Sequence, residues 1–190
     1  MKIFTNIYDR IIELAYKKNV TRYLYFLSFI ESFIFPIPPD VLLAPIALTK
    51  KYNWIKLAFY TTLSSVIGGL VGYILGIYLY EIALLNNIID EDVFLEVKNL
   101  FLKHGVIIMI IAGFTPLPFK AFTIIAGYMS LSIIPFIISS FIGRGLRFFL
   151  VSALFNYFGI ERANRLKKYF EYIGIILTII LLLLIYYKFS

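Results

Sequence analysis

The sequence predicts an all-α integral membrane protein, and three observations support this prediction. Of the 190 residues, 61% are hydrophobic and 15% are charged, and the mean hydropathy of +0.89 is far above that of soluble domains. The charged residues fall in short segments between long apolar ones. Two apolar segments contain closely spaced prolines, which end helices. We expect a single membrane domain, residues 1–190, with a core at residues 22–165.

The composition excludes several classes of function. The chain has no cysteine, which excludes disulfides, thiolate catalysis and iron–sulfur sites. Its one histidine, His104, cannot form a histidine cluster, and we expect neither a metal nor a cofactor. We expect no enzymatic activity, because the sequence has no G-x-S-x-G motif and no histidine cluster. The net charge of +7 comes from cations that flank apolar segments, as in positive-inside topology, so we expect no nucleic-acid partner.

Residues 1–18 predict an amphipathic helix that lies in the membrane interface. Polar side chains recur at helical spacing on one face, and apolar side chains fill the rest. The polar positions are Asn6, Asp9, Arg10, Glu13 and Lys17. A helix that packs on its own protein fits this pattern equally well. Because the first apolar turns carry charges, we expect no cleavable signal peptide and a cytoplasmic N-terminus.

Residues 23–48 predict a re-entrant hairpin. The apolar arm at residues 23–34 is roughly 18 Å long as a helix, about half of a bilayer core. A second apolar arm, residues 41–48, follows the break. The break contains Pro36, Pro38 and Pro39. The cations that flank the hairpin are Lys17, Lys18 and Arg22 before it and Lys50, Lys51 and Lys56 after it. Cations at both ends place both ends in the cytoplasm.

Residues 54–80 predict the first full membrane span. Gly68, Gly72 and Gly76 recur at every fourth position of this segment. Small residues at this spacing let helix backbones approach closely in membranes. We therefore expect the glycines to pack against another helix, either within one chain or between two chains of a homo-oligomer.

The second half of the chain repeats this plan from the external side. Residues 81–103 predict an acidic loop and a short amphipathic helix at 90–103, followed by an apolar arm that is again too short to cross. The arm breaks at Pro116 and Pro118. Residues 132–158 predict a second full span. A cationic segment at 161–168 marks the return to the cytoplasm, and residues 170–188 predict a C-terminal transmembrane helix.

The two breaks align as an internal repeat. Pro36-Ile37-Pro38 matches Pro116-Leu117-Pro118, and Asp40 falls on Lys120, all at an offset of 80 residues. Because one hairpin enters from each side, the repeat is inverted, as in many secondary transporters. We expect Asp40 and Lys120 to lie within ion-pair or single-water reach, either as parts of one functional site or as a structural pair.

At these residues the chain resembles the DedA family of SNARE-associated, VTT-domain membrane proteins, most closely its YqaA-like subgroup. The resemblance covers residues 22–165. It rests on SFIESFIFPIPPDVLL (28–43), GGLVGYILG (68–76), the segment from KHG to FTPLPFKAFTIIAG (103–127) and IGRGLRFF (142–149). It implies a re-entrant-hairpin fold in the bacterial inner membrane. It also implies movement of lipids or lipid-linked carriers, such as undecaprenyl phosphate, between leaflets, coupled to ion gradients.

The resemblance also implies a set of functional residues. Glu31 and Asp40 match two acids of the family, whereas Gly113 and Lys120 stand where it has arginines. We expect Arg144 and Arg147 to serve in their place, unless these two side chains only extend towards the membrane surface.

These residues predict a transporter or flippase for an anionic lipid. Lys120, Arg144 and Arg147 would bind the headgroup. Glu31 and Asp40 would exchange protons, because removal from water favours the neutral form of a carboxylic acid. The alternative function is a membrane assembly or scaffolding factor that transports nothing.

Overall fold

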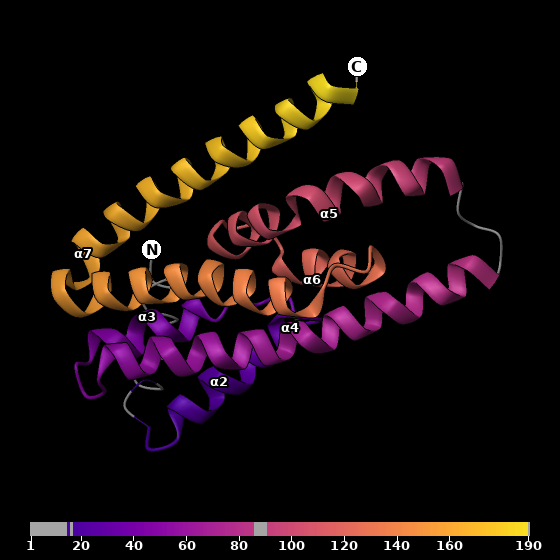
Figure 1. The fold of residues 1–190 in the computed structure, drawn as a ribbon. Helices are drawn as coiled ribbons and strands as arrows, with labels where there is room; N and C mark the ends of the chain where they lie inside the picture. Colours follow the sequence, from indigo (N-terminus) through magenta and orange to yellow (C-terminus); the bar gives the residue numbers. More distant parts are fainter. Residues whose placement is uncertain (1–14, 16, 86–90, 190) are drawn as a thin grey trace.

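A computed structural model describes residues 15, 17–85 and 91–189, and this part of the chain forms six helices (Figure 1). Residues 1–14 and 16, and with them most of the predicted amphipathic helix at 1–18, lie outside the described residues. The helices are α2 (Val20–Glu31), α3 (Asp40–Leu48), α4 (Trp54–Leu85), α5 (Glu91–Phe114), α6 (Phe119–Tyr128) and α7 (Ile133–Phe189).

Two long apolar helices form the centre of the bundle. The segments Trp54–Ile82 of α4 and Ile133–Gly159 of α7 are long and apolar enough to cross a membrane, in agreement with the predicted spans at 54–80 and 132–158. They pack against each other. Large apolar side chains such as Ile67 and Ile138 are about half exposed on their outer faces. Such an exposed apolar surface suits contact with lipid rather than water.

Helix α7 bends sharply at Gly159. The φ and ψ angles of Gly159 are 70° and −179°, in a region that glycine adopts and other residues avoid. The bend falls between the predicted span at 132–158 and the predicted C-terminal helix at 170–188. After it, the last part of α7 runs in a different direction from the bundle (Figure 1, yellow).

The short helices form two pairs, each joined by a proline-containing turn. Residues 32–39 join α2 to α3, and residues 115–118 join α5 to α6. The two arms of each pair pack on different long helices: α2 packs on α4 and α3 on α7, whereas α5 packs on α7 and α6 on α4 (Figure 1). Each turn therefore lies between the two central helices.

Helix α5 differs from the expected arrangement. The sequence predicts a short amphipathic helix at 90–103 and a separate apolar arm, but the structure has one continuous helix of 24 residues. The sequence contains no proline between Glu91 and Thr115 that would interrupt it. Gly105, at the expected junction, is packed between Phe101 and Leu131, so a single glycine does not end the helix here.

Glycines set the closest helix contacts. A Cβ atom at Gly68 would collide with the backbone of Phe29 in α2, and one at Gly76 would collide with the backbone of Ile124 in α6. Gly127 of α6 lies in the same way against the Tyr73 carbonyl. The glycine stripe of α4 thus packs against helices of its own chain. Gly72, between these contacts, lies against the side chains of Thr123 and Phe33.

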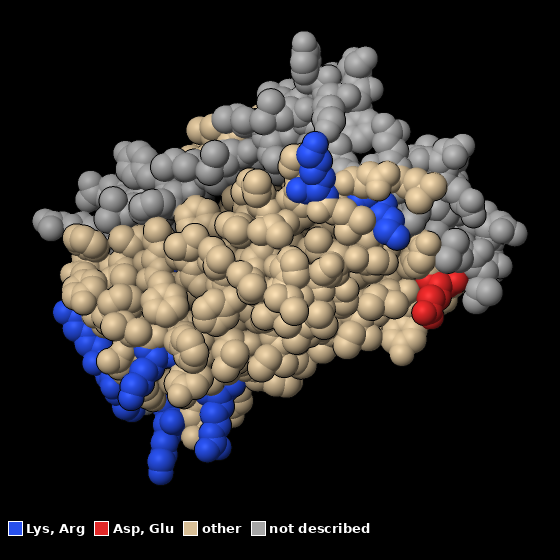
Figure 2. Space-filling view, in the orientation of Figure 1, with Lys and Arg blue, Asp and Glu red and all other residues tan. Residues whose placement is uncertain are grey.

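Most of the exposed cations in the described part of the chain lie at one end of the bundle. The cations around the start of α2 and the connection from α3 to α4 are exposed and gather at one end of the molecule (Figure 2, lower left). They are Lys17, Lys18, Arg22, Lys50, Lys51 and Lys56. The exposed acid Glu81 lies near the other end of α4. Figure 2 also shows cations away from the lower-left end, and Lys103 of α5 is likewise exposed.

This charge distribution predicts which residues share a side of the membrane. Single cysteines in place of the exposed Lys18 and Lys51 should both react with an impermeant thiol reagent added from the cytoplasmic side. A cysteine in place of Glu81 should react only from outside. Labelling of residues 18 and 51 from opposite sides would contradict the hairpin topology.

The glycine contacts predict a strong dependence on side-chain size. Gly127→Ala should lower the stability of the purified protein by about 1 to 3 kcal/mol, because α6 must move away from the Tyr73 carbonyl. Gly145→Ala is the matched control, since its Cβ would meet only Thr62 at 3.7 Å, an ordinary contact. Thermal unfolding in detergent measures both variants. Equal unfolding temperatures would show that this close approach does not contribute to stability.

Candidate functional site

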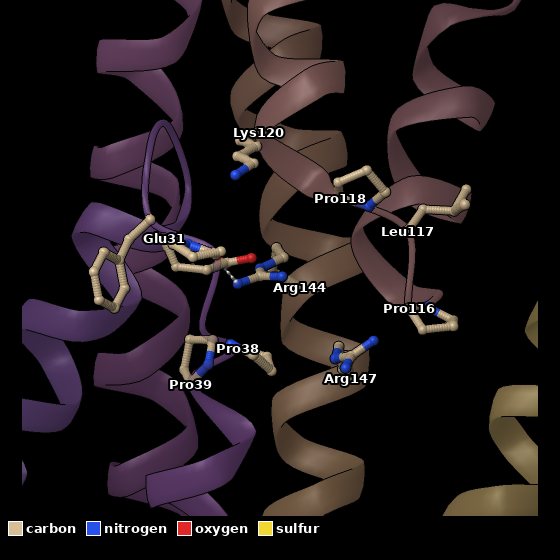
Figure 3. Close-up of a pocket in the computed structure, with 11 residues that line it drawn as sticks. Glu31, Pro38, Pro39, Pro116, Leu117, Pro118, Lys120, Arg144 and Arg147 are labelled. Carbon is tan, nitrogen blue, oxygen red and sulfur yellow. Dashed lines mark hydrogen bonds and ion pairs between the residues drawn. The ribbon is translucent and has the colours of Figure 1, made fainter.

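A cavity of about 300 Å³ lies where the two proline turns face each other (Figure 3). Prolines of both turns form much of its wall, and one acid and three cations point into it. The lining residues are Glu31, Phe35, Pro36, Pro38, Pro39, Pro116, Leu117, Pro118, Lys120, Arg144 and Arg147. The cavity therefore combines an apolar wall with a group of charges inside a helix bundle.

Arg144 is held rigidly inside the bundle. Its side chain is 4% exposed, and its Nη2 lies 2.5 Å from Glu31 Oε2. Its Nε donates to Ser65 Oγ of α4 at 2.8 Å. The guanidinium lies between the rings of Phe119 and Phe148, at 4.9 and 4.6 Å from their centroids, as a buried cation–π contact. Arg144 therefore points inward and does not extend towards the membrane surface.

The polar groups around Glu31 connect α2 to α4. Glu31 is the last residue of α2 and is 9% exposed. The next residue, Ser32, bonds through its Oγ to Ser65 Oγ at 2.8 Å, and Ser28 Oγ donates to the Thr61 carbonyl at 2.9 Å. Ser65 thus contacts both Ser32 and the Arg144 guanidinium, so that one hydroxyl links three helices.

Arg147 forms a second ion pair one turn further along α7. Its Nη2 and Nε donate to Asp40 Oδ2 at 2.6 and 3.1 Å, and its Nη1 donates to the Thr115 carbonyl at 2.8 Å. Asp40 is 3% exposed and is the first residue of α3, where the helix dipole stabilises a negative charge. Arg147 therefore joins the first proline turn to the second.

Asp40 and Lys120 form no direct ion pair with each other in this structure. Asp40 pairs with Arg147, whereas Lys120 Nζ donates to the Ile34 carbonyl at 3.1 Å. The packing explains the difference, because α3 lies on α7 and α6 lies on α4. Asp40 at the start of α3 therefore meets a cation of α7. The match of the two proline motifs at an offset of 80 residues does not bring Asp40 and Lys120 into direct contact.

Four of the other predicted site residues lie together in the structure. The cavity is lined by Glu31, Lys120, Arg144 and Arg147. Asp40 does not line it but accepts a hydrogen bond from Arg147. Three residues that hold Arg144 in place are absent from the site that the sequence predicts: Ser65, Phe119 and Phe148. Ser65 gave a signal, because it belongs to the run of small polar residues Thr61, Thr62, Ser64 and Ser65. Nothing in the sequence indicated the two phenylalanines.

Gly113 explains why Arg144 and Arg147 come from α7. A Cβ at Gly113 would lie 3.0 Å from the backbone nitrogen of Arg144, so this position of α5 has little room for a side chain. An arginine here would push α5 away from α7. The close contact of Gly113 with Gly143 instead brings the arginine-bearing turn of α7 up to the cavity.

The charges of the site sum to one positive charge. Within the part of the chain that the structure describes, the site contains three cations, Lys120, Arg144 and Arg147, and two acids, Glu31 and Asp40. The described residues contain no group of three His, Asp or Glu side chains that could hold a metal ion. The arrangement suits recognition of an anion, since guanidinium and ammonium groups bind carboxylate and phosphate oxygens.

Comparison with known proteins identifies the family. The VTT domain matches residues 35–157, which include both proline turns and both arginines. The chain belongs to the VTT-domain family. This VTT-domain protein is also 39% identical over 178 residues to an uncharacterized protein of Haemophilus influenzae, with 92% of each chain covered. An uncharacterized protein of Histophilus somni is 37% identical over the same length and coverage. No solved structure matches the chain.

The VTT-domain match places most of the site within the family's domain. It begins at Phe35, in the first proline turn, and ends at Tyr157, two residues before the bend of α7. All cavity-lining residues except Glu31 lie inside these bounds. The YqaA-like subgroup stays a prediction from the sequence motifs.

The Arg147–Asp40 pair predicts a difference between single and double substitutions. Asp40→Asn or Arg147→Gln alone should lower stability by about 3 to 5 kcal/mol, because each leaves an uncompensated buried charge. The double variant Asp40→Asn with Arg147→Gln leaves no charge behind and should recover most of this loss. Thermal unfolding in detergent measures all three variants. If the double variant is as unstable as the sum of the single variants, the two side chains do not stabilise each other.

Proposed function

We propose that this VTT-domain protein moves an anionic lipid between the leaflets of the bacterial inner membrane. The observation that carries the proposal is the cavity between the proline turns, in which Lys120, Arg144 and Arg147 meet inside an apolar bundle. Charged side chains inside a membrane are energetically costly, and they typically mark substrate or ion pathways. Membership of the VTT-domain family and the resemblance to DedA proteins support the same function.

In this proposal the two helix pairs are re-entrant hairpins of an inverted repeat. The exchange of packing partners supports it, since α2 relates to α4 as α5 relates to α7, and α3 relates to α7 as α6 relates to α4. Helices α2, α3 and α6 have 12, 9 and 10 residues, too short to cross a bilayer. The cationic end at Lys18 and Lys51 would face the cytoplasm.

A lipid is favoured over a water-soluble anion because the mouth of the cavity is apolar. Pro36, Pro38, Pro116 and Pro118 are exposed at the turns, and Ile34 and Ile37 of the first turn are 67% and 44% exposed. Acyl chains would lie against this apolar rim while the headgroup reaches the cations. Such a division of apolar and charged surface matches the two parts of an amphiphile.

The proposal includes coupling to protons. Glu31 forms an ion pair with Arg144, and Asp40 forms one with Arg147. Without these ion pairs, each arginine could bind a headgroup phosphate. Protonation of either carboxyl would release its arginine, and rebinding of the carboxylate would expel the headgroup. Each acid would thereby exchange a proton in step with the lipid.

Reconstitution into liposomes tests the proposed function. Wild-type protein should expose a fluorescent anionic phospholipid of the inner leaflet to an impermeant quencher faster than protein-free vesicles do. The double variant Asp40→Asn with Arg147→Gln should fold and insert, but should lose this activity because the site lacks one cation and one acid. Lys103→Gln, an exposed substitution on α5, is the matched control. No lipid movement by well-folded wild-type protein would favour the scaffolding function instead.

A further inference from the structure

The cavity contains one cation that is not balanced by a carboxylate in the described part of the chain. Arg144 pairs with Glu31 and Arg147 pairs with Asp40. The Lys120 ammonium makes a different kind of contact, a hydrogen bond to the neutral carbonyl of Ile34 at 3.1 Å. The site therefore has a net charge of one positive unit, and Lys120 carries it.

We propose that this charge balance selects a phosphodiester headgroup over a phosphomonoester. The inference rests on the proposed function and specifies the substrate class. A phosphodiester carries one negative charge, whereas a phosphomonoester carries about 1.5 to 2 near pH 7. In the state that the structure shows, before any proton is taken up, Glu31 and Asp40 are each bonded to an arginine, and one negative charge then neutralises the excess charge of Lys120. A second negative charge would remain uncompensated next to the buried Glu31 and Arg144, which is unfavourable.

Lys120 is the specificity-determining residue in this arrangement. All three nitrogens of Arg147 are already engaged, and Arg144 uses Nε and Nη2 and keeps only Nη1 for a further contact. The Lys120 ammonium has three donors, and Ile34 takes one of them. Two donors and a full positive charge are thus available at the cavity wall. A phosphodiester offers two non-bridging oxygens to accept from them.

The size and rim of the cavity fit a lipid-borne phosphodiester. About 300 Å³ accommodates a phosphate with a small alcohol on its outer side and leaves no room for acyl chains. The chains would leave past the exposed Pro36 and Pro116 of the two turns. A phosphodiester without chains would reach the same ammonium but would lose the contact with this apolar rim.

Competition binding to the full-length protein in detergent tests the inference. The probe is a fluorescent phosphatidylglycerol. The competitors are dihexanoyl phosphatidylglycerol, dihexanoyl phosphatidic acid, zwitterionic dihexanoyl phosphatidylcholine and glycerophosphoglycerol without chains. Dihexanoyl phosphatidylglycerol should bind about tenfold or more tightly than each of the other three. Lys120→Gln should abolish this preference and Lys120→Arg should retain it, whereas Lys103→Gln should match the wild type.

The outcomes separate the inference from the proposed function. If phosphatidic acid binds as tightly as phosphatidylglycerol, the charge selection is wrong while an anionic-lipid site remains. If neither anionic lipid competes, the proposed function fails together with the inference. Equal binding of chainless glycerophosphoglycerol would assign the cavity to a soluble phosphodiester. A folded Lys120→Gln protein with unchanged preference would remove Lys120 from selection, and the wild-type series stands even if this variant does not fold.

Discussion

The two arginine–carboxylate pairs of α7 are the interactions on which the position of the first proline turn depends. Glu31 ends α2 and Asp40 begins α3, so Arg144 and Arg147 hold both ends of the turn against one helix. In an apolar bundle each of these charges would be strongly unfavourable alone. The turn can therefore occupy only the place where both pairs form. The backbone that the prolines free from helical bonding is in this way fixed at the cavity wall.

These pairs form only because the helices lie unusually close together. Gly68 lets α2 approach α4, and the contact of Gly113 with Gly143 lets α5 approach α7. A larger residue at either place would move an arm of a proline turn away from the arginines. The glycines thus act on the site through helix spacing, although none of them lines the cavity. Hydroxyl groups such as Ser65 then fill the remaining polar contacts between the helices.

The sequence was enough to predict features that have local causes, but it was not enough to predict contacts that depend on how the helices pack. Hydropathy predicted the two spans, and the prolines marked the ends of α2 and α5, since proline acts on its own turn. The offset of 80 residues predicted equivalent positions for Asp40 and Lys120, but equivalence carries no information on contact. Which arm packs on which long helix decides the pairing, and this is a tertiary property. The ring contacts of Phe119 and Phe148 with Arg144 depend on the same packing.

The two proline turns are held differently, because Asp40 follows the first turn and Lys120 follows the second. The first turn is tied to α7 by two buried ion pairs, whose disruption costs about 3 to 5 kcal/mol each when one partner is left behind. The second turn is held by hydrogen bonds from Arg147 to the Thr115 carbonyl, from Lys120 to the Ile34 carbonyl and from Thr123 Oγ1 to the Ser32 carbonyl, each worth about 1 to 3 kcal/mol. A motion of α6 that opens the cavity therefore breaks hydrogen bonds, the contact of Phe119 with Arg144 and close packing on α4, but no ion pair, whereas a motion of α2 or α3 breaks an ion pair. Because Lys120 belongs to α6, a motion of α6 also carries with it the cation that no carboxylate of the described residues balances.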